Sequence, residues 1–174
     1  MQAMKKNLLI LLMLVAFLNG FAQELNTVVF DEKSNQEILI GFCNIEGFTS
    51  GSFNNWFQTE YDNYIIDSET LGQINAEMFD SLEITIVLGT WCSDSQREFP
   101  RFYKILEYLN FSFDYLTIIA VNREKKAEDT HADRLNIELV PTIIFYNQEK
   151  EIGRIIESPE ISLEKDMQKI LSKL

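Results

Sequence analysis

The fold of this chain is decided by residues 84–100, which read Ile-Thr-Ile-Val-Leu-Gly-Thr-Trp-Cys-Ser-Asp-Ser-Gln-Arg-Glu-Phe-Pro. The apolar run from Ile84 to Leu88 is typical of a central strand that is buried on both faces. The residues after it predict a helix from about Ser93 to Leu109. Cys92 therefore stands where a buried strand passes into a helix. The unpaired N–H groups and the positive dipole end of that helix favour the thiolate over the thiol.

The rest of the chain alternates short apolar runs with segments of helical spacing. Thr27–Phe30 and Glu37–Phe42 are expected to form a hairpin. The aromatic segment from Trp56 to Ile65 is expected to form a short helix or an aromatic cluster, which packs on the main domain or, as the alternative, offers a platform for a ligand. The further predicted elements are a helix over 67–79, strands over 116–121, 143–146 and 151–156, and a last helix over 162–173. This order predicts an α/β fold with a mixed sheet.

Three segments are expected along the 174 residues. Residues 1–22 resemble a signal peptide, with Lys5-Lys6 ahead of the apolar run Leu8–Leu18 and with small residues at Gly20 and Ala22. Residues 23–66 form an N-terminal extension, and residues 67–174 form the main domain. The apolar run is short for a membrane-spanning helix, so the mature protein is expected to be exported, periplasmic or extracellular, without a stable membrane anchor.

Charge and composition exclude several classes of partner. The net charge is −12, and removing residues 1–22 takes away two lysines and no acid, which leaves −14. Such an acidic chain is a poor partner for nucleic acid and for anionic lipid. Two cysteines and the single histidine, His131, give weak support for a metal site, so no metal and no cofactor are expected.

The residues around Cys92 suit a reactive thiol. Gly89 permits a tight exit from the strand, and Trp91 is placed to shield one side of the sulfur. Ser95 lies one helical turn beyond Cys92, where its hydroxyl is expected to donate a hydrogen bond to the thiolate. Val140-Pro141 is a candidate cis peptide, and the Val140 backbone is expected to be exposed beside the sulfur, where it would pair with an extended substrate.

These residues carry a family resemblance. The segment from about Ser68 to Leu174 resembles thioredoxin in Trp91-Cys92-x-x-Ser95, in Pro100 inside the helix, and in Val140-Pro141-Thr142. With Glu151–Ile155 the likeness is closer to exported bacterial thioredoxin-like proteins. The resemblance implies the thioredoxin fold, thiol–disulfide chemistry at Cys92, and substrate binding by Trp91, Val140, Pro141 and Thr142.

Two departures from that family set the expected chemistry. Ser95 replaces the resolving cysteine, and Ile86 stands where dithiol thioredoxins carry a buried aspartate. A serine hydroxyl cannot attack a mixed disulfide, because exchange requires a thiolate at each step. The sequence thus favours monothiol exchange on protein or small-molecule thiols and disulfides, with an external reducing partner.

Two alternatives stay open from the sequence. Cys43 would act as a resolving cysteine, or as one half of a Cys43–Cys92 redox switch, if the extension folds over Cys92; a small buried residue in a strand is the simpler interpretation. The other alternative is a non-catalytic binding module on a thioredoxin scaffold. Fold alone does not separate these functions.

Overall fold

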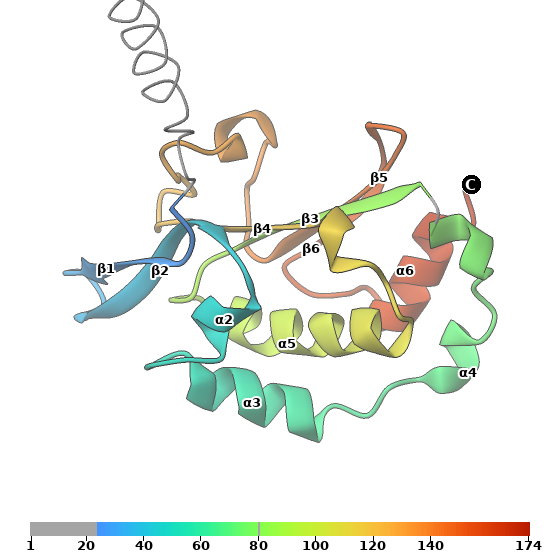
Figure 1. The fold of residues 1–174 in the computed structure, drawn as a ribbon, viewed down its shortest axis with the longest axis horizontal. Helices are drawn as coiled ribbons and strands as arrows, with labels where there is room; N and C mark the ends of the chain where they lie inside the picture. The colour runs from blue at the N-terminus through green and yellow to red at the C-terminus, as the bar shows by residue number, and fades with distance from the viewer. Residues whose placement is uncertain (1–23, 80) are drawn as a thin grey trace, which may run out of the picture.

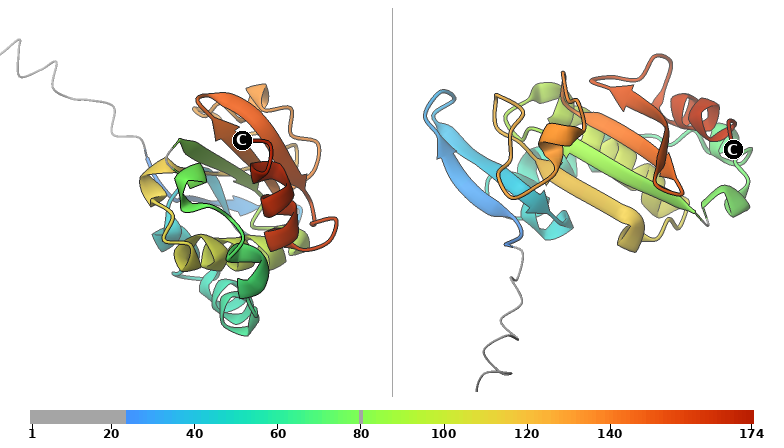
Figure 2. Two further views of the ribbon diagram at one scale, coloured as in Figure 1. Left: turned by 90° about the vertical axis from the view of Figure 1, so that its right-hand side faces the viewer. Right: turned by 90° about the horizontal axis from the view of Figure 1, so that it is seen from above.

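The computed structural model describes residues 24–79 and 81–174, and the predicted signal peptide lies outside them. One six-stranded sheet has the order β1-β2-β4-β3-β5-β6 (Figures 1 and 2). Its strands are β1 (Thr27–Asp31), β2 (Gln36–Cys43), β3 (Leu82–Leu88), β4 (Leu116–Ala120), β5 (Thr142–Asn147) and β6 (Lys150–Ile156). The mixed sheet predicted from the sequence is confirmed, since β3 and β4 are parallel and the other pairs are antiparallel.

Strand β3 forms the centre of the sheet, as its apolar sequence predicted. Side chains from Ile84 to Leu88 are at most 7% exposed, on both faces. The strand pairs with β4 on one side, from Ile84 with Leu116 to Leu88 with Ala120, and with β5 on the other. Helix α5 (Ser93–Tyr108) connects β3 to β4. A strand–helix–strand unit of this kind places the helix against one face of the sheet.

The predicted N-terminal hairpin is present and joins the main sheet. Strands β1 and β2 pair from Thr27 with Ile40 to Asp31 with Gln36. The end of β2 then pairs antiparallel with β4, where Cys43 lies opposite Ile118. The hairpin thus extends the central sheet at one edge, at the end away from α6 (Figure 2).

Two helical layers cover one face of the sheet. Helix α5 and helix α6 (Leu163–Leu171) pack their apolar sides on it, and helix α3 (Asn54–Asn63) lies outside α5 (Figure 1). The aromatic segment of the extension supplies this outer contact, as predicted: Phe57 packs against Phe99 and Tyr103, with ring centroids 5.7 and 6.1 Å apart. A short helix, α2 (Ile45–Phe48), adds Phe48 to the same cluster.

An irregular segment covers part of the opposite face. Residues 121–141 run between β4 and β5 and contain, as regular structure, the short 3-10 helix η3 (Ala132–Arg134). They bury a second, smaller apolar cluster around Val87, Ile119 and Val140, and Trp91 and Cys92 pack against this cluster. The thiol site therefore borders the face that carries no long helix among the described residues.

One predicted helix is wrong in extent. The segment 67–79 forms a single turn, α4 (Ser68–Leu71), capped by the Asp67 carboxylate, and a separate 3-10 turn, η1 (Ala76–Phe79). Gly72 ends the first turn, in keeping with the low helix propensity of glycine and the polar residues that follow. A further 3-10 turn that the sequence did not predict, η2 (Phe113–Tyr115), precedes β4.

The thioredoxin fold with an N-terminal extension is confirmed at the level of architecture. The parallel β3-α5-β4 unit, the β5-β6 hairpin beside β3, and the terminal helix α6 form the central mixed sheet flanked by helices that the sequence predicted. The domain boundary at residue 67 stays a prediction. Within residues 24–79 and 81–174, no helix has the length and apolarity needed to cross a membrane.

If the extension contributes to the core of the folded chain, truncating its central aromatic residue will be costly. Phe57 is 3% exposed. We expect Phe57→Ala to lower the free energy of unfolding by about 3–5 kcal/mol, measured by urea denaturation. Ile65→Ala in the same extension is the control, because Ile65 is 89% exposed and should change it by less than about 0.5 kcal/mol. Equal effects from the two variants would contradict a packed extension.

Candidate active site at the strand-to-helix junction

Cys92 is the residue that begins helix α5. Its backbone is extended, with φ −97° and ψ 125°, and its carbonyl accepts the first helical hydrogen bond from the Gln96 N–H at 3.0 Å. The Cys92 N–H donates to the Gly89 carbonyl at 2.9 Å, which closes a tight turn after β3. The side chain is half-buried. The sulfur is thus carried at the N-terminal end of a 16-residue helix, where the helix dipole favours a negative charge.

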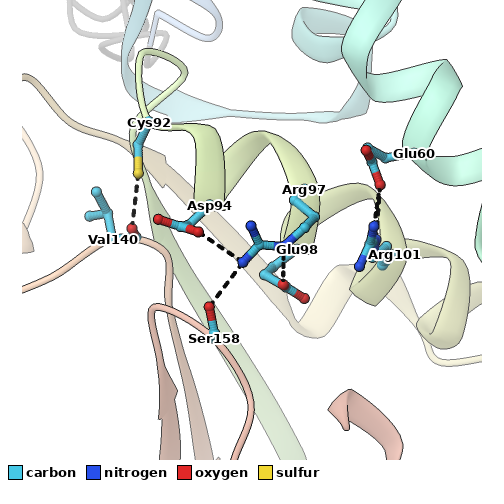
Figure 3. Close-up of polar contacts among 8 residues, drawn as sticks. All are labelled: Glu60, Cys92, Asp94, Arg97, Glu98, Arg101, Val140 and Ser158. Carbon is cyan, nitrogen blue, oxygen red and sulfur yellow. Dashed lines mark hydrogen bonds and ion pairs between the residues drawn. The ribbon is translucent and has the colours of Figure 1, made fainter.

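The thiol faces the backbone of the loop before β5. The Cys92 Sγ lies 3.2 Å from the Val140 carbonyl oxygen, within reach for the thiol to donate (Figure 3). The Val140–Pro141 peptide bond is cis. Two segments that are 48 residues apart in the sequence therefore meet at one sulfur atom. This is the juxtaposition that the sequence predicted for Cys92 and Val140.

Ser95 has a different contact from the one predicted. Its side chain is fully buried, and its Oγ accepts a hydrogen bond from the Gly89 N–H at 3.2 Å. No hydrogen bond joins Ser95 to Cys92 among the described residues. The hydroxyl satisfies the backbone of the turn instead, because the glycine amide points into the first turn of the helix.

Trp91 is fixed beside the thiol by its own contacts. Its indole Nε1 donates to the Val121 carbonyl at 2.9 Å, and the guanidinium of Arg123 lies 4.8 Å from the centroid of its ring. The ring packs so closely on Gly89 that a Cβ at that position would stand 2.6 Å from it. A side chain at residue 89 would therefore displace the tryptophan.

The other predicted substrate-binding residues are buried. Thr142 is 1% exposed and its Oγ1 donates to the Leu139 carbonyl at 2.7 Å. The Pro141 carbonyl accepts from the Glu157 N–H at 2.7 Å. These two residues hold the loop in place. The expected exposure of Val140 is wrong: it is 4% exposed, because it packs in the apolar cluster of this face and its carbonyl faces Cys92. The sequence assigned substrate binding to all three residues of the Val140-Pro141-Thr142 motif and did not distinguish the residues that hold the loop from the one that faces the thiol.

An ionic network lies along α5 next to the thiol (Figure 3). Arg97 pairs with Asp94 at 2.8 Å and with Glu98 at 2.6 Å, and it donates to the Ser158 Oγ at 3.0 Å. The guanidinium is therefore occupied by two carboxylates and connects α5 to the segment after β6. It does not contact Cys92 in this arrangement.

Glu98 is a residue that sequence reasoning missed. Surface exposure is usual for a carboxylate, but Glu98 is 5% exposed and paired with Arg97. Its burial could have been predicted from helical spacing. The buried side of α5 includes Ser95, Phe99 and Phe102, and residue 98 lies on the same side of the helix. A carboxylate on such a stripe requires a partner, and Arg97 provides it.

Cys43 is too far from Cys92 to serve as its resolving cysteine. Cys43 pairs with Ile118, which pairs with Ile86. Because neighbouring strands are about 4.8 Å apart, the backbones of Cys43 and Ile86 are about 10 Å apart, and Cys92 lies beyond the end of β3. A disulfide requires Cα atoms within about 7 Å. The redox switch considered from the sequence therefore does not fit this fold, in which both cysteines are free thiols.

Burial also makes Cys43 a poor nucleophile. Its side chain is 8% exposed, and loss of solvent raises the pKa of the thiol from 9.0 to about 12. The Sγ lies 3.6 Å from the Gly41 carbonyl oxygen. At neutral pH this thiol is protonated, so the expected interpretation as a small buried strand residue is the one that the geometry supports.

Metal-ligating side chains do not gather in the part of the chain that the structure describes, where no three of His, Cys, Asp and Glu form a possible metal site. His131 is exposed, and the centroid of its ring lies 5.8 Å from the centroid of the Phe42 ring.

Among known proteins, this chain is similar to several solved structures. No family model and no curated protein matches the chain. The thioredoxin Deadhead of Drosophila melanogaster is 15% identical, with 56% of this chain and 86% of that one covered and a TM-score of 0.38. Mitochondrial thioredoxin 3 of Saccharomyces cerevisiae is 15% identical, with 60% of this chain and 90% of that one covered and a TM-score of 0.38. A protein of unknown function from Pseudomonas aeruginosa is 18% identical, with 68% of this chain and 78% of that one covered and a TM-score of 0.41.

The raised pKa of Cys43 predicts a loss of stability at alkaline pH. The unfolded thiol ionises near pH 9.0 and the folded one only near 12, so its contribution is complete below the first value and is lost as pH rises towards the second. Between pH 8 and pH 10, wild type should lose about 1.4 kcal/mol more unfolding free energy than Cys43→Ala, measured by urea denaturation at each pH. Parallel curves for the two proteins would contradict the burial of this thiol.

Proposed function

We propose that this protein carries out monothiol thiol–disulfide exchange through Cys92, on disulfides of proteins or small molecules outside the cytoplasm. The observation that carries the proposal is the half-buried Cys92 Sγ at the start of α5, 3.2 Å from the Val140 carbonyl. A thiol at a helix N-terminus is favoured as the thiolate, the form that attacks disulfides. Trp91 and Val140 border the sulfur; Trp91 is partly exposed and is the side chain that an incoming substrate would meet, whereas Val140 is buried and faces the thiol with its carbonyl.

The reaction has two exchanges. The Cys92 thiolate attacks one sulfur of a substrate disulfide; a mixed disulfide forms and the other substrate sulfur leaves as a thiolate. A second thiolate must then attack this mixed disulfide and restore Cys92. Ser95 cannot supply it, because its oxygen has a far higher pKa than a thiol, and Cys43 is out of reach and protonated. An external thiol therefore completes each cycle.

Export is the second part of the proposal. The positive charge and apolar run of residues 1–22 suit a cleaved signal peptide, as found in exported bacterial thioredoxin-like proteins. An extracytoplasmic compartment is oxidising and supplies disulfides, and the external thiol that a single-cysteine site requires comes from a reducing partner.

A binding module without turnover is the competing function. Two features favour it: Ser95 in place of a resolving cysteine, and Ile86, which is fully buried where a proton-accepting aspartate would stand. The thiol would then serve only to pack beside Val140.

Thiol reactivity separates the two functions. In Cys43→Ala, Cys92 is the single thiol, and we expect iodoacetamide at pH 7 to alkylate it about fivefold or more faster when the protein is folded than when it is unfolded in urea. The matched control is Cys92→Ala, whose buried Cys43 should react at least about a hundredfold more slowly in the folded state. Mixing Cys43→Ala with oxidised glutathione should yield a mixed disulfide seen by intact mass. A Cys92 that reacts no faster when folded and forms no mixed disulfide would establish the binding module.

Restoring the second cysteine should change the fate of the mixed disulfide. In Cys43→Ala, the adduct on Cys92 should persist until an external thiol is added. In Cys43→Ala with Ser95→Cys, the introduced thiol one helical turn away should expel the adduct and close an internal disulfide with Cys92. Intact mass after gel filtration measures both states, and Ser93→Cys, at an exposed neighbouring position, is the control. Spontaneous loss of the adduct from the protein that keeps Ser95 would contradict the monothiol mechanism.

A further inference from the structure

Two residues from distant parts of the chain, Asp31 and Arg123, form an ion pair, and Arg123 also contacts Trp91, the residue before Cys92. Arg123, in the segment after β4, donates from its Nε to the Asp31 carboxylate at 2.9 Å. The same guanidinium lies 4.8 Å from the centroid of the Trp91 ring. Asp31 ends strand β1, so this chain of contacts runs from the N-terminal hairpin to the thiol loop.

The carboxylate of Asp31 is held as an anion. It accepts from the Ser34 hydroxyl and N–H and from the Lys33 N–H, within the turn between β1 and β2. The Ser34 hydroxyl and then Arg123 lower the pKa of Asp31 to about 2. The carboxylate therefore keeps its charge at every pH at which the protein would act, and it orients the planar guanidinium over the indole.

A second contact leads from the same hairpin to the same loop. The Leu39 N–H of β2 donates to the Thr90 Oγ1 at 3.1 Å, and both residues are buried. The Thr90 carbonyl in turn accepts from the Gln96 Nε2 at 2.7 Å. Both residues immediately before Cys92 are thus fixed by the hairpin, through different atoms.

From these contacts we propose that Asp31 and Arg123 are positioning residues of the thiol site, and that the β1–β2 hairpin serves to hold Trp91 and the turn that presents Cys92. This inference rests on the proposed exchange at Cys92. Asp31 orients Arg123, Arg123 stacks on Trp91, and Trp91 limits the directions from which a disulfide approaches the sulfur.

The test measures the exchange rate of Cys92 with 4,4′-dithiodipyridine at pH 7, a neutral disulfide that long-range charge does not steer. All proteins carry Cys43→Ala. We expect Asp31→Asn and Arg123→Ala each to slow the second-order rate by about three- to tenfold. The double variant should be no slower than Arg123→Ala alone, because Asp31 acts through Arg123.

Ser34→Ala is the matched control. It removes a hydrogen bond from the same Asp31 carboxylate but leaves the contact with Arg123, so the rate should stay within about 1.5-fold of the parent. Losses in Asp31→Asn and Arg123→Ala that multiply in the double variant, or a loss in Ser34→Ala as large as theirs, would show general loosening of the hairpin and overturn the proposal.

Fluorescence tests the positioning without relying on exchange. In Trp56→Phe, Trp91 is the single tryptophan. Removing Arg123 or Asp31 in this background should shift its emission to longer wavelength, because the indole loses its fixed contacts, whereas Ser34→Ala should leave it unchanged. Unchanged emission in all variants overturns the positioning role. An inert Cys92 with shifted emission would instead overturn the exchange function and leave the positioning intact.

Discussion

Strand β3 is hydrogen-bonded on both sides and covered on both faces, and this burial determines where the thiol lies. Its pairing with β4 and β5 leaves no freedom of register, because a shift by one residue would move Ile84, Ile86 and Leu88 away from the helical face. Strand β3 ends at Leu88, and the turn to α5 begins at Gly89. The sheet therefore brings Cys92 to the same edge at which β5 begins, beside Val140.

The turn between β3 and α5 is held by polar contacts with nearby residues, in addition to the contact that Thr90 receives from Leu39 of the hairpin. Ser95 accepts from the Gly89 amide, Gln96 donates to the Thr90 carbonyl, and the Gly89 carbonyl accepts from Cys92. Buried backbone groups without partners would be costly, so each of these contacts stabilises one conformation of the turn. Ser95 thereby has a structural role in this turn.

The sequence predicts the parts of this fold that follow from local pattern and fails where distant segments decide. Apolar runs predicted β3, β4 and the β5–β6 hairpin, and the motif at Cys92 predicted its contact with Val140. The predicted helix over 67–79 was broken at Gly72, since a few apolar positions do not outweigh a glycine and polar neighbours. The hydrogen bond expected from Ser95 to Cys92 was not found, because the competing Gly89 amide is revealed only by three-dimensional geometry.

The place of the N-terminal extension could not be foreseen, because it depends on pairing between β2 and β4 and on contacts between residues far apart in the sequence, such as Asp31 with Arg123. This pairing has two consequences for chemistry. It fixes Cys43 in an inner strand, where burial raises its pKa to about 12 and removes it from redox use. It also brings the β1–β2 turn to the residues beside Cys92. One strand pairing thus withholds a second thiol from the site and supports the first.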